Sequence, residues 1–341
     1  MTPRERYVLL KTIELYMETG EPVGSRTLQK KFSMDISSAT IRNVMSDLED
    51  KSYLYQPHTS AGRLPTDEGI KYYINYLLFS IGEIETGIGV QIVDYIRNFK
   101  KETFDEIFNA VLKFLTRSTG YVSLGMKCAI DALVIKEISM IKVSMSKVLI
   151  VITCEPEYII HQIFPLKVEP SILLKISREL TSKFRGKTLS SVKKELIGEI
   201  NRVQKEFLEL SFSLKSHIIK MVDNVNDINI SGTSNIFNVL EEDFNRVQKI
   251  INVLEEKKTL LETFEKLIDT ADKITVVLGT DTEIEALEPF SIVTAKYSVK
   301  SKDAGLVGIL GPKRMEYSRI IPVVENVSKA LSRMLSQEKY R

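Results

Sequence analysis

Residues 37–45 read Ser37-Ser38-Ala39-Thr40-Ile41-Arg42-Asn43-Val44-Met45, and their spacing is typical of an amphipathic helix. Ser37 or Ser38 is a suitable N-cap, because a serine hydroxyl can accept a hydrogen bond from a free N–H group of the first turn. Apolar residues follow at the spacing i, i+3, i+4 and i+7, as Ile41, Val44, Met45 and Leu48. We therefore expect this stripe to be buried and the opposite face to lie in solvent.

The expected outward face carries Ala39, Arg42, Asn43 and Ser46, with Ser38 at its N-terminal edge. These side chains suit the major groove of duplex DNA, since arginine can reach guanine O6 and N7, asparagine can pair with adenine, and a methyl group can touch thymine. Free N–H groups at the helix N-terminus can also meet a phosphate. We expect Arg42 and Asn43 to read bases, assisted by Ser38 and Ala39.

The surrounding segments complete a three-helix pattern with a hairpin. Residues 4–19 predict a first helix that ends near Gly20, and a second short helix begins at Ser25. Residues 51–66 predict strand, loop and strand, and the uncharged loop at 57–62 is followed by Arg63. This order is that of a winged helix-turn-helix, whose wing can lie along the DNA backbone or enter a minor groove. A solvated amphipathic helix followed by an ordinary turn is the structural alternative.

The candidate DNA contacts come from all three segments. Lys30, Lys31 and Arg63 are expected to position the phosphate backbone. His58 can equally be an ordinary exposed loop histidine. The full set comprises Ser25, Arg26, Lys30, Lys31, Ser37, Ser38, Ala39, Thr40, Arg42, Asn43, Ser46, His58, Thr59, Ser60 and Arg63.

Composition limits the class of protein. The 341 residues suggest two or three domains, and 43% hydrophobic with 27% charged residues is ordinary globular composition. The net charge of +2 gives no support for nucleic-acid binding, so that case depends on local charge: residues 22–46 carry four Lys or Arg against Asp35 alone. The chain has no apolar N-terminal leader and no run long enough for a membrane span, so we expect a cytoplasmic protein without membrane contact.

No pattern predicts an enzyme or a bound cofactor. Two cysteines and three scattered histidines make neither a disulfide framework nor a metal site, and no catalytic triad or carboxylate pair is indicated. The glycine run at 305–311 precedes a predicted helix, but it has neither the Walker nor the dinucleotide spacing. A turn between strand and helix is the better interpretation. We expect no cofactor and no metal.

Three runs resemble one known family. They are residues 22–28 (PVGSRTL), 38–45 (SATIRNVM) and 56–66 (QPHTSAGRLPT), and the third is long and specific. They are similar to the HrcA family of bacterial heat-inducible transcription repressors. The resemblance implies a homodimer that binds an inverted-repeat operator ahead of chaperone operons and that is kept active by the GroEL chaperonin. An alternative is a regulator whose sheet domain senses a small molecule.

The remaining sequence predicts a multidomain α+β chain. Residues 1–80, which include a helix at 67–79, form the winged-helix domain, and the glycine-containing residues 81–90 form a linker. A helix is expected at 92–117, strands at 121–128, 133–143 and 147–153, more strands at 273–279, 291–299 and 305–310, and a last helix at 313–336. These segments predict a discontinuous sheet domain, 91–155 and 229–341, which the resemblance names GAF-like.

Residues 156–228 are expected to be an insertion in that domain. Apolar residues from Val192 to Met221 recur every three or four positions, which predicts one helix of about eight turns. Such a helix needs cover, either from a second subunit or from the chain's own helices at 241–269. The resemblance favours a second subunit, because it implies that this insertion dimerises. The helix at 67–79 is a further candidate for contact with the second copy.

Overall fold

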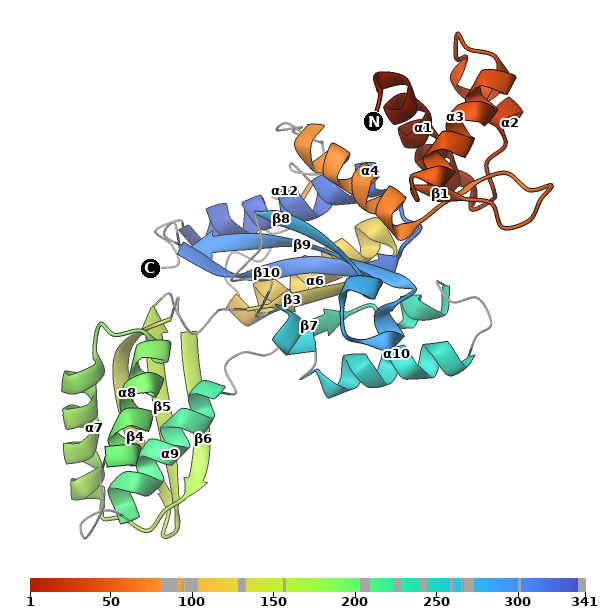
Figure 1. Cartoon of the computed structure of the whole chain (residues 1–341). Helices are drawn as coiled ribbons and strands as arrows, with labels where there is room; N and C mark the ends of the chain where they lie inside the picture. The colour runs from red at the N-terminus through yellow and green to blue at the C-terminus, as the bar shows by residue number, and fades with distance from the viewer. Residues whose placement is uncertain are drawn as a thin grey trace.

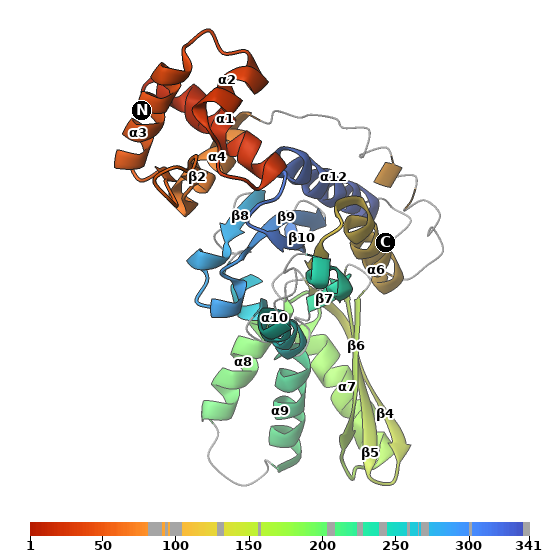
Figure 2. The same ribbon diagram turned by 90° about the vertical axis from the view of Figure 1, so that its right-hand side faces the viewer.

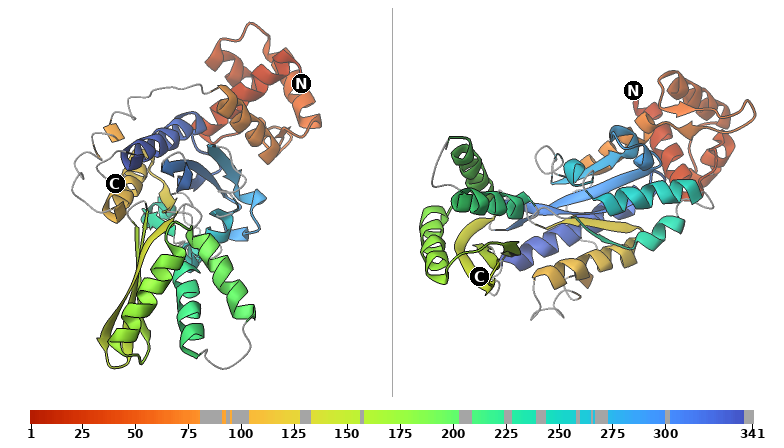
Figure 3. Two further views of the ribbon diagram at one scale, coloured as in Figure 1. Left: turned by 90° about the vertical axis from the view of Figure 1, so that its left-hand side faces the viewer. Right: turned by 90° about the horizontal axis from the view of Figure 1, so that it is seen from below.

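The computed structural model describes residues 1–80, 91–92, 95, 104–127, 133–155, 158–202, 209–223, 228–238, 244–257, 260–264, 266, 273–299 and 302–336. Within these residues the chain is a mixed α+β protein with sheets of two, five and three strands (Figure 1). The N-terminal helices and the three-stranded sheet lie at opposite ends of the five-stranded sheet (Figure 3). The expectation of a multidomain α+β chain is confirmed. The predicted linker 81–90 and Cys128 lie outside the described residues.

The chain begins with three helices and a short hairpin. These are α1 (Pro3–Thr19), α2 (Ser25–Phe32), α3 (Ser38–Asp50), β1 (Leu54–Tyr55) and β2 (Leu64–Pro65). Helix α1 begins at Pro3, one residue before the predicted range, because Thr2 and Glu5 form a reciprocal capping box, and it is capped at its end by Gly20, which has a left-handed φ of 76°. All the predicted elements of this region are therefore present.

Helix α4 (Asp67–Ser80) follows the hairpin directly and is tied to it. The Thr66 hydroxyl donates to the Ser52 carbonyl at 2.7 Å, and the rings of Tyr53 and Tyr72 pack edge to face at 5.7 Å. A Cβ on Gly69 would lie 2.3 Å from the Tyr53 carbonyl oxygen, so only glycine lets α4 approach this closely. Residues 1–80 are therefore one unit, called the head below.

The central sheet has the strand order β7-β3-β10-β9-β8 and is antiparallel throughout. Its strands are β3 (Val122–Met126), β7 (Ile228–Ser231), β8 (Ile274–Leu278), β9 (Phe290–Val299) and β10 (Lys302–Pro312). Alternation along β10 places Val307 and Ile309 on one face and Leu306 and Leu310 on the other. Helices therefore cover both faces of this sheet.

The first face is covered by α6 (Phe104–Thr119) and α12 (Tyr317–Ser336), and its core is continuous with that of the head. The second face is covered by α10 (Phe244–Glu256) and the 3-10 turns η1 (Thr233–Asn238) and η3 (Glu285–Leu287). We call the five strands with these helices the central unit. In Figure 1, α12 and α10 lie on opposite sides of the sheet.

Residues 305–310 lie in a strand, as predicted, but the whole glycine run belongs to that strand and does not form the predicted turn between strand and helix. Gly305, Gly308 and Gly311 all lie within β10, and the turn occupies residues 313–316, so α12 starts four residues later than predicted. A Cβ on Gly308 would meet the Val293 carbonyl oxygen at 2.3 Å. Gly308 therefore serves close packing between strands. The predicted turn was misplaced because glycine spacing alone does not distinguish a crowded strand from a loop.

The predicted boundary of the insertion at 155/156 is wrong. Strands β4 (Val134–Ser144) and β5 (Lys147–Glu155) pair with β6 (Tyr158–Pro165) in a separate three-stranded sheet, and neither joins the central sheet. The insertion therefore starts between β3 and β4. The sequence misled because β5 is a continuous apolar run, which suits a central strand of either sheet equally well.

The single long helix predicted across 192–221 is also wrong. The structure has α8 (Leu189–Arg202) and α9 (Glu209–Asp223), which pack together with α7 (Pro170–Phe184) on one face of the three-stranded sheet (Figure 2). Val192, Leu196, Leu214 and Ile218 share one core with Ile138, Ile150 and Ile152. Both helices present the same period to the core, so their stripes read as one in the sequence. Residues 133–223 are called the inserted unit below.

Candidate nucleic-acid interface

Two hydroxyl groups stabilise the start of helix α3. Ser37 has an extended backbone and its Oγ accepts the Thr40 N–H at 3.0 Å, while the Ser37 and Thr40 hydroxyls lie 2.9 Å apart. A serine cap of this kind stabilises a helix by about 1 kcal/mol. Ser37 is thus the N-cap, which was one of the two predicted alternatives. The hydroxyls of Ser37 and Thr40 each have a local partner.

The outward face of α3 has the predicted composition. Ala39, Arg42, Asn43 and Ser46 are exposed, and Ser38 is half-buried at the edge. Ile41 and Leu48 are fully buried, and Val44 and Met45 are nearly so. The predicted division of this helix into two faces is confirmed. Whether the outer face contacts DNA remains a prediction.

Helix α2 supplies cations beside α3. Arg26, Lys30 and Lys31 are all exposed. Lys31 Nζ lies 2.7 Å from Glu18 Oε1, so its charge is partly neutralised within the head. Arg26, Lys30 and Arg42 have no ion-pair partner among the described residues. Three free positive charges therefore lie on α2 and the outward face of α3.

The hairpin loop is held in shape by Gln56. Its amide nitrogen donates to the carbonyls of Thr59 at 3.0 Å and Ala61 at 2.8 Å, and the Ala61 N–H donates to the His58 carbonyl at 2.8 Å. These bonds fix a compact loop that exposes His58, Thr59 and Ser60. Sequence reasoning did not predict the role of Gln56. Its position at the end of a strand beside a loop rich in backbone acceptors was the available signal.

A second strand contact anchors the loop to the helices. Val23 and Arg63 form an antiparallel bridge with two backbone hydrogen bonds of 2.9 Å. A Cβ on Gly62 would lie 2.5 Å from the Val23 carbonyl, so the loop can approach the start of α2 only with glycine there. Val23 and Gly62 are therefore structural residues. Both lie in the sequence runs quoted above, but only the fold shows that they contact each other.

Arg63 differs from the expected phosphate contact. Its side chain is only 15% exposed, and Nε lies 2.8 Å from Glu49 Oε2, although the N–H does not point at that oxygen well enough for a hydrogen bond. The other Glu49 oxygen accepts the Gln56 N–H at 3.0 Å. Arg63 thus ties the loop to the C-terminal half of α3, because a buried guanidinium needs an acidic partner.

A cleft of about 320 Å³ separates α2, α3 and the loop. It brings together several predicted contacts from three segments, and its polar lining includes Ser25, Arg42, Gln56, Thr59, Ser60 and Arg63. Ser25 opens α2, where unpaired N–H groups favour an anion. The site can thus accept a negatively charged group between a helix terminus and a guanidinium.

No three His, Cys, Asp or Glu side chains gather as a metal site within the described residues. Among those same residues, no helix is both long enough and apolar enough to cross a bilayer. Cys154 is buried and forms no disulfide.

Comparison with known proteins identifies the family. Residues 105–321 match the sequence profile described as the HrcA protein C-terminal domain. A heat-inducible transcription repressor HrcA from Thermodesulfovibrio yellowstonii is 32% identical over 98% of this chain and 97% of its own length. Those from Moorella thermoacetica and Clostridium perfringens are 31% and 30% identical, also over nearly full length.

A solved structure shares the fold. A crystal structure of a hypothetical protein matches with a TM-score of 0.61 and 24% identity, and the match covers 98% of this chain and 99% of that one. The three segments that first suggested the resemblance are all in the head, whereas the family profile matches the central and inserted units. Because both the profile and the full-length relatives agree, this chain belongs to the HrcA family of heat-inducible transcription repressors.

Proposed function

We propose that the head is a winged helix-turn-helix that binds operator DNA and that the chain acts as a homodimeric repressor of chaperone operons. The proposal rests on one observation: α3 exposes Arg42 and Asn43 while burying Ile41 and Leu48, beside a constrained loop and a basic helix. Membership of a repressor family supports the same function. In this proposal α3 enters the major groove, which is wide enough to admit one helix.

The three segments divide the work of recognition. Arg42 and Asn43 read base edges with help from Ser38 and Ala39, and Ser46 faces the same groove further along α3. The hydroxyls of Ser37 and Thr40 support the helix start. The loop residues His58, Thr59 and Ser60 meet the backbone or the minor groove, and the cleft at Ser25 and Arg42 accepts a phosphate. Arg26 and Lys30 add unpaired charge along the phosphate track, while Lys31 contributes less.

The three-stranded sheet supports self-association. Its inner face is covered by α7, α8 and α9, but its outer face carries exposed Ile141, Ile159 and Ile163. Ile141 pairs across the strands with Leu149, and Leu149 pairs with Ile163, so the apolar side chains form a continuous row. The uncovered face of an antiparallel sheet is normally polar, and a contiguous apolar face marks an interaction site. A second copy of the inserted unit is the proposed occupant.

Helix α4 has a different role from the one considered in the sequence. Its buried residues Ile70, Tyr73 and Ile74 contact the chain's own α1, α12 and β8, so this stripe is not free for a second copy. We propose that the inserted unit carries the main dimer contact. Two heads then present α3 to successive turns of one DNA face, which requires half-sites separated by whole helical turns.

Heat induction follows from limited stability. If the active dimer is only marginally stable, warming lowers its concentration, and a chaperonin of the GroEL type restores it while free of other unfolded chains. Chaperonin occupied by heat-damaged proteins no longer does so, and the operon is released. We also propose that the central unit is GAF-like. The alternative function is a regulator that senses a small molecule through this unit, and a thermal-shift screen with metabolites would distinguish that function from the proposed one.

Footprinting on the promoter of the organism's own chaperonin operon tests the function. The expected result is protection of an inverted repeat by the purified chain, with affinity that falls steeply as salt rises. Adding chaperonin should raise the protection, and adding unfolded protein should cancel that gain. Absence of protection at any salt concentration would contradict DNA binding, and protection without a response to chaperonin would contradict the stress mechanism alone.

A further inference from the structure

One carboxylate of the head is held by two segments of the central unit. Lys313, in the turn after β10, donates from Nζ to both oxygens of Asp67 at 2.9 and 2.8 Å. Thr280, in the turn η2 (Gly279–Asp281), donates its hydroxyl to Asp67 Oδ2 at 2.8 Å. The Lys313 side chain is only 21% exposed. Asp67 opens α4, so this contact holds the first turn of the helix that connects head and centre.

A second ion pair of opposite polarity lies one turn further along α4. Lys71 Nζ lies 2.7 Å from Asp281 Oδ1 and 3.2 Å from Glu68 Oε1. Asp67 and Lys71 are four residues apart and so share one face of the helix. Along α4 the head therefore presents an anion and then a cation. The central unit places Lys313 opposite the anion and Asp281 opposite the cation.

This alternation specifies one register of α4 on the central unit. A slide of α4 by one turn would bring a like charge against Asp281 or Lys313, and juxtaposed like charges are repulsive. Burial of Asp67 raises the pKa of its carboxyl, but hydrogen bonds from Lys313 and Thr280 outweigh burial and hold that pKa below the usual value. The ionised form that the register needs is thus the stable one.

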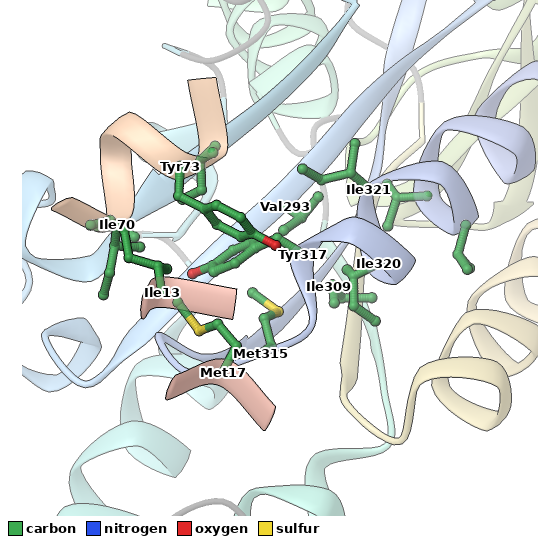
Figure 4. Packing of buried hydrophobic residues seen from close by; sticks show 14 of the residues in the cluster. Ile13, Met17, Ile70, Tyr73, Val293, Ile309, Met315, Tyr317, Ile320 and Ile321 are labelled. Carbon is green, nitrogen blue, oxygen red and sulfur yellow. The ribbon is translucent and has the colours of Figure 1, made fainter. Parts of the chain in front are cut away.

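An apolar contact lies beneath the ion pairs but has less directional preference. Ile13 and Met17 of α1 and Ile70 and Tyr73 of α4 lie near Met315, Tyr317, Ile320 and Ile321 of the central unit, in one continuous core (Figure 4). Hydrophobic contact is roughly proportional to buried area and is not directional. The charges therefore add to this core a directional preference that buried area alone does not supply.

Gly20 adds a third polar contact at the end of α1. A Cβ there would lie 1.9 Å from a guanidinium nitrogen of Arg314, so that guanidinium sits against the helix C-terminus. A cation at this position is favourable, because the last carbonyls carry partial negative charge. The central unit thus holds both α4 and α1 of the head.

We propose that Asp67, Lys71, Asp281 and Lys313 are positioning residues that set the orientation of the head on the central unit and thereby the operator spacing that a dimer accepts. The consequence for spacing rests on the proposed operator binding. A rigidly held pair of heads gains affinity by binding two half-sites at once, and it loses this gain where the geometry forbids simultaneous contact. Freely mounted heads would tolerate many spacings.

The test compares operators of different spacing with variants of one ion pair. Inserting about five base pairs turns one half-site by half a helical turn, and the unaltered chain should lose about 100-fold in affinity. The variant Lys313→Glu, which repels Asp67, should bind both operators almost equally and a single half-site as tightly as the unaltered chain. The double variant Asp67→Lys/Lys313→Glu should restore the spacing preference. Glu285→Lys, at the exposed pair with Lys249, is the control that should change nothing.

A measurement without DNA separates the two proposals. Spin labels introduced through Asp50→Cys in the head and Glu288→Cys in the central unit, in a chain with Cys128→Ala and Cys154→Ala and diluted with unlabelled protein, report the distance between the units. The distribution should be narrow in this background and broad with Lys313→Glu. A narrow distribution in that variant, or an unchanged spacing preference, would overturn the inference. If the distance distribution broadens with Lys313→Glu as expected but the chain binds no operator, the proposed function and its consequence for operator spacing are overturned. The role of these residues in orienting the head is then left intact.

Discussion

The head and the inserted unit each expose a face that no other described segment covers, but the chemistry of the two faces is opposite. The head exposes Arg42, Asn43 and Ser46 on α3, whereas the inserted unit exposes Ile141, Ile159 and Ile163 on its sheet. Polar and charged groups can keep much of their hydration while they contact a phosphate backbone, since such interfaces are wet. Apolar area gains about 25 cal/mol per Å² when removed from water, so it is stabilised by another apolar surface. This contrast is why we propose DNA as the partner of the head and a second copy of the chain as the partner of the inserted unit.

The substitution Ile163→Glu should give the largest effect. A carboxylate in the middle of the apolar row would have to be buried unpaired in a dimer, so we expect monomers and a loss of about 100-fold in operator affinity, because the second head no longer binds together with the first. Light scattering gives the mass, and mobility shifts give the affinity. The control is Ile172→Glu on α7, an exposed isoleucine outside the row. A dimer that survives Ile163→Glu would move the protein contact elsewhere.

The substitution Gly62→Ala should loosen the loop of the head. Because the added methyl would lie 2.5 Å from the Val23 backbone, we expect the free energy of unfolding to fall by about 1–3 kcal/mol. Urea denaturation measures this change. Gly24→Ala, whose Cβ meets nothing closer than 3.6 Å, should cost less than about 1 kcal/mol through its N-cap position. Equal losses in the two variants would show that the close approach is not what requires glycine at 62.

The substitution Arg42→Ala should affect one base position. We expect a loss of about 1–3 kcal/mol on the intact operator and almost none on an operator already altered at that position. Competition binding with single-base operator variants measures both values. Asp50→Ala, at the far end of α3, serves as the control. Unchanged discrimination would show that the outer face of α3 is not the reading surface.

The smallest effect compares two neighbouring lysines. Lys30→Ala should lower the slope of log affinity against log salt by about one for every sequence, since one phosphate contact is lost. Lys31→Ala should lower it less, because Lys31 already pairs with Glu18 at 2.7 Å. Titration of binding against salt concentration distinguishes the two. A larger change with Lys31 would mean that the pair with Glu18 opens when DNA binds.

Local patterns predicted the head well because its elements are specified by neighbours in sequence. The capping of α1 by Thr2 and Glu5, the cap of α3 at Ser37 and the buried stripe from Ile41 to Leu48 all involve residues within a few turns of one another. Periodicity is most reliable for such segments. The role of Arg63 could not be predicted in this way, since its partner Glu49 lies on another element.

The inserted unit was predicted less well because its errors concern pairing and not element type. The strands at β4 and β5 were expected close to where they occur, yet both were assigned to the wrong sheet. Likewise, α8 and α9 were read as one helix, since both place apolar residues at the same period. Which strand pairs with which, and where a helix folds back, depends on contacts between distant residues.

The sequence by itself determined the face that α3 turns to solvent, the helix caps and the family, because these depend on residue types at short, fixed spacings. Only the tertiary structure decided to which sheet β4 and β5 belong and that Arg63 pairs with Glu49. It also decided that Asp67 contacts Lys313 and that Lys71 contacts Asp281, although more than 200 positions of chain separate the partners. The reason is that side chains so far apart in sequence have no periodic relation, and their contact exists only once the whole core has formed.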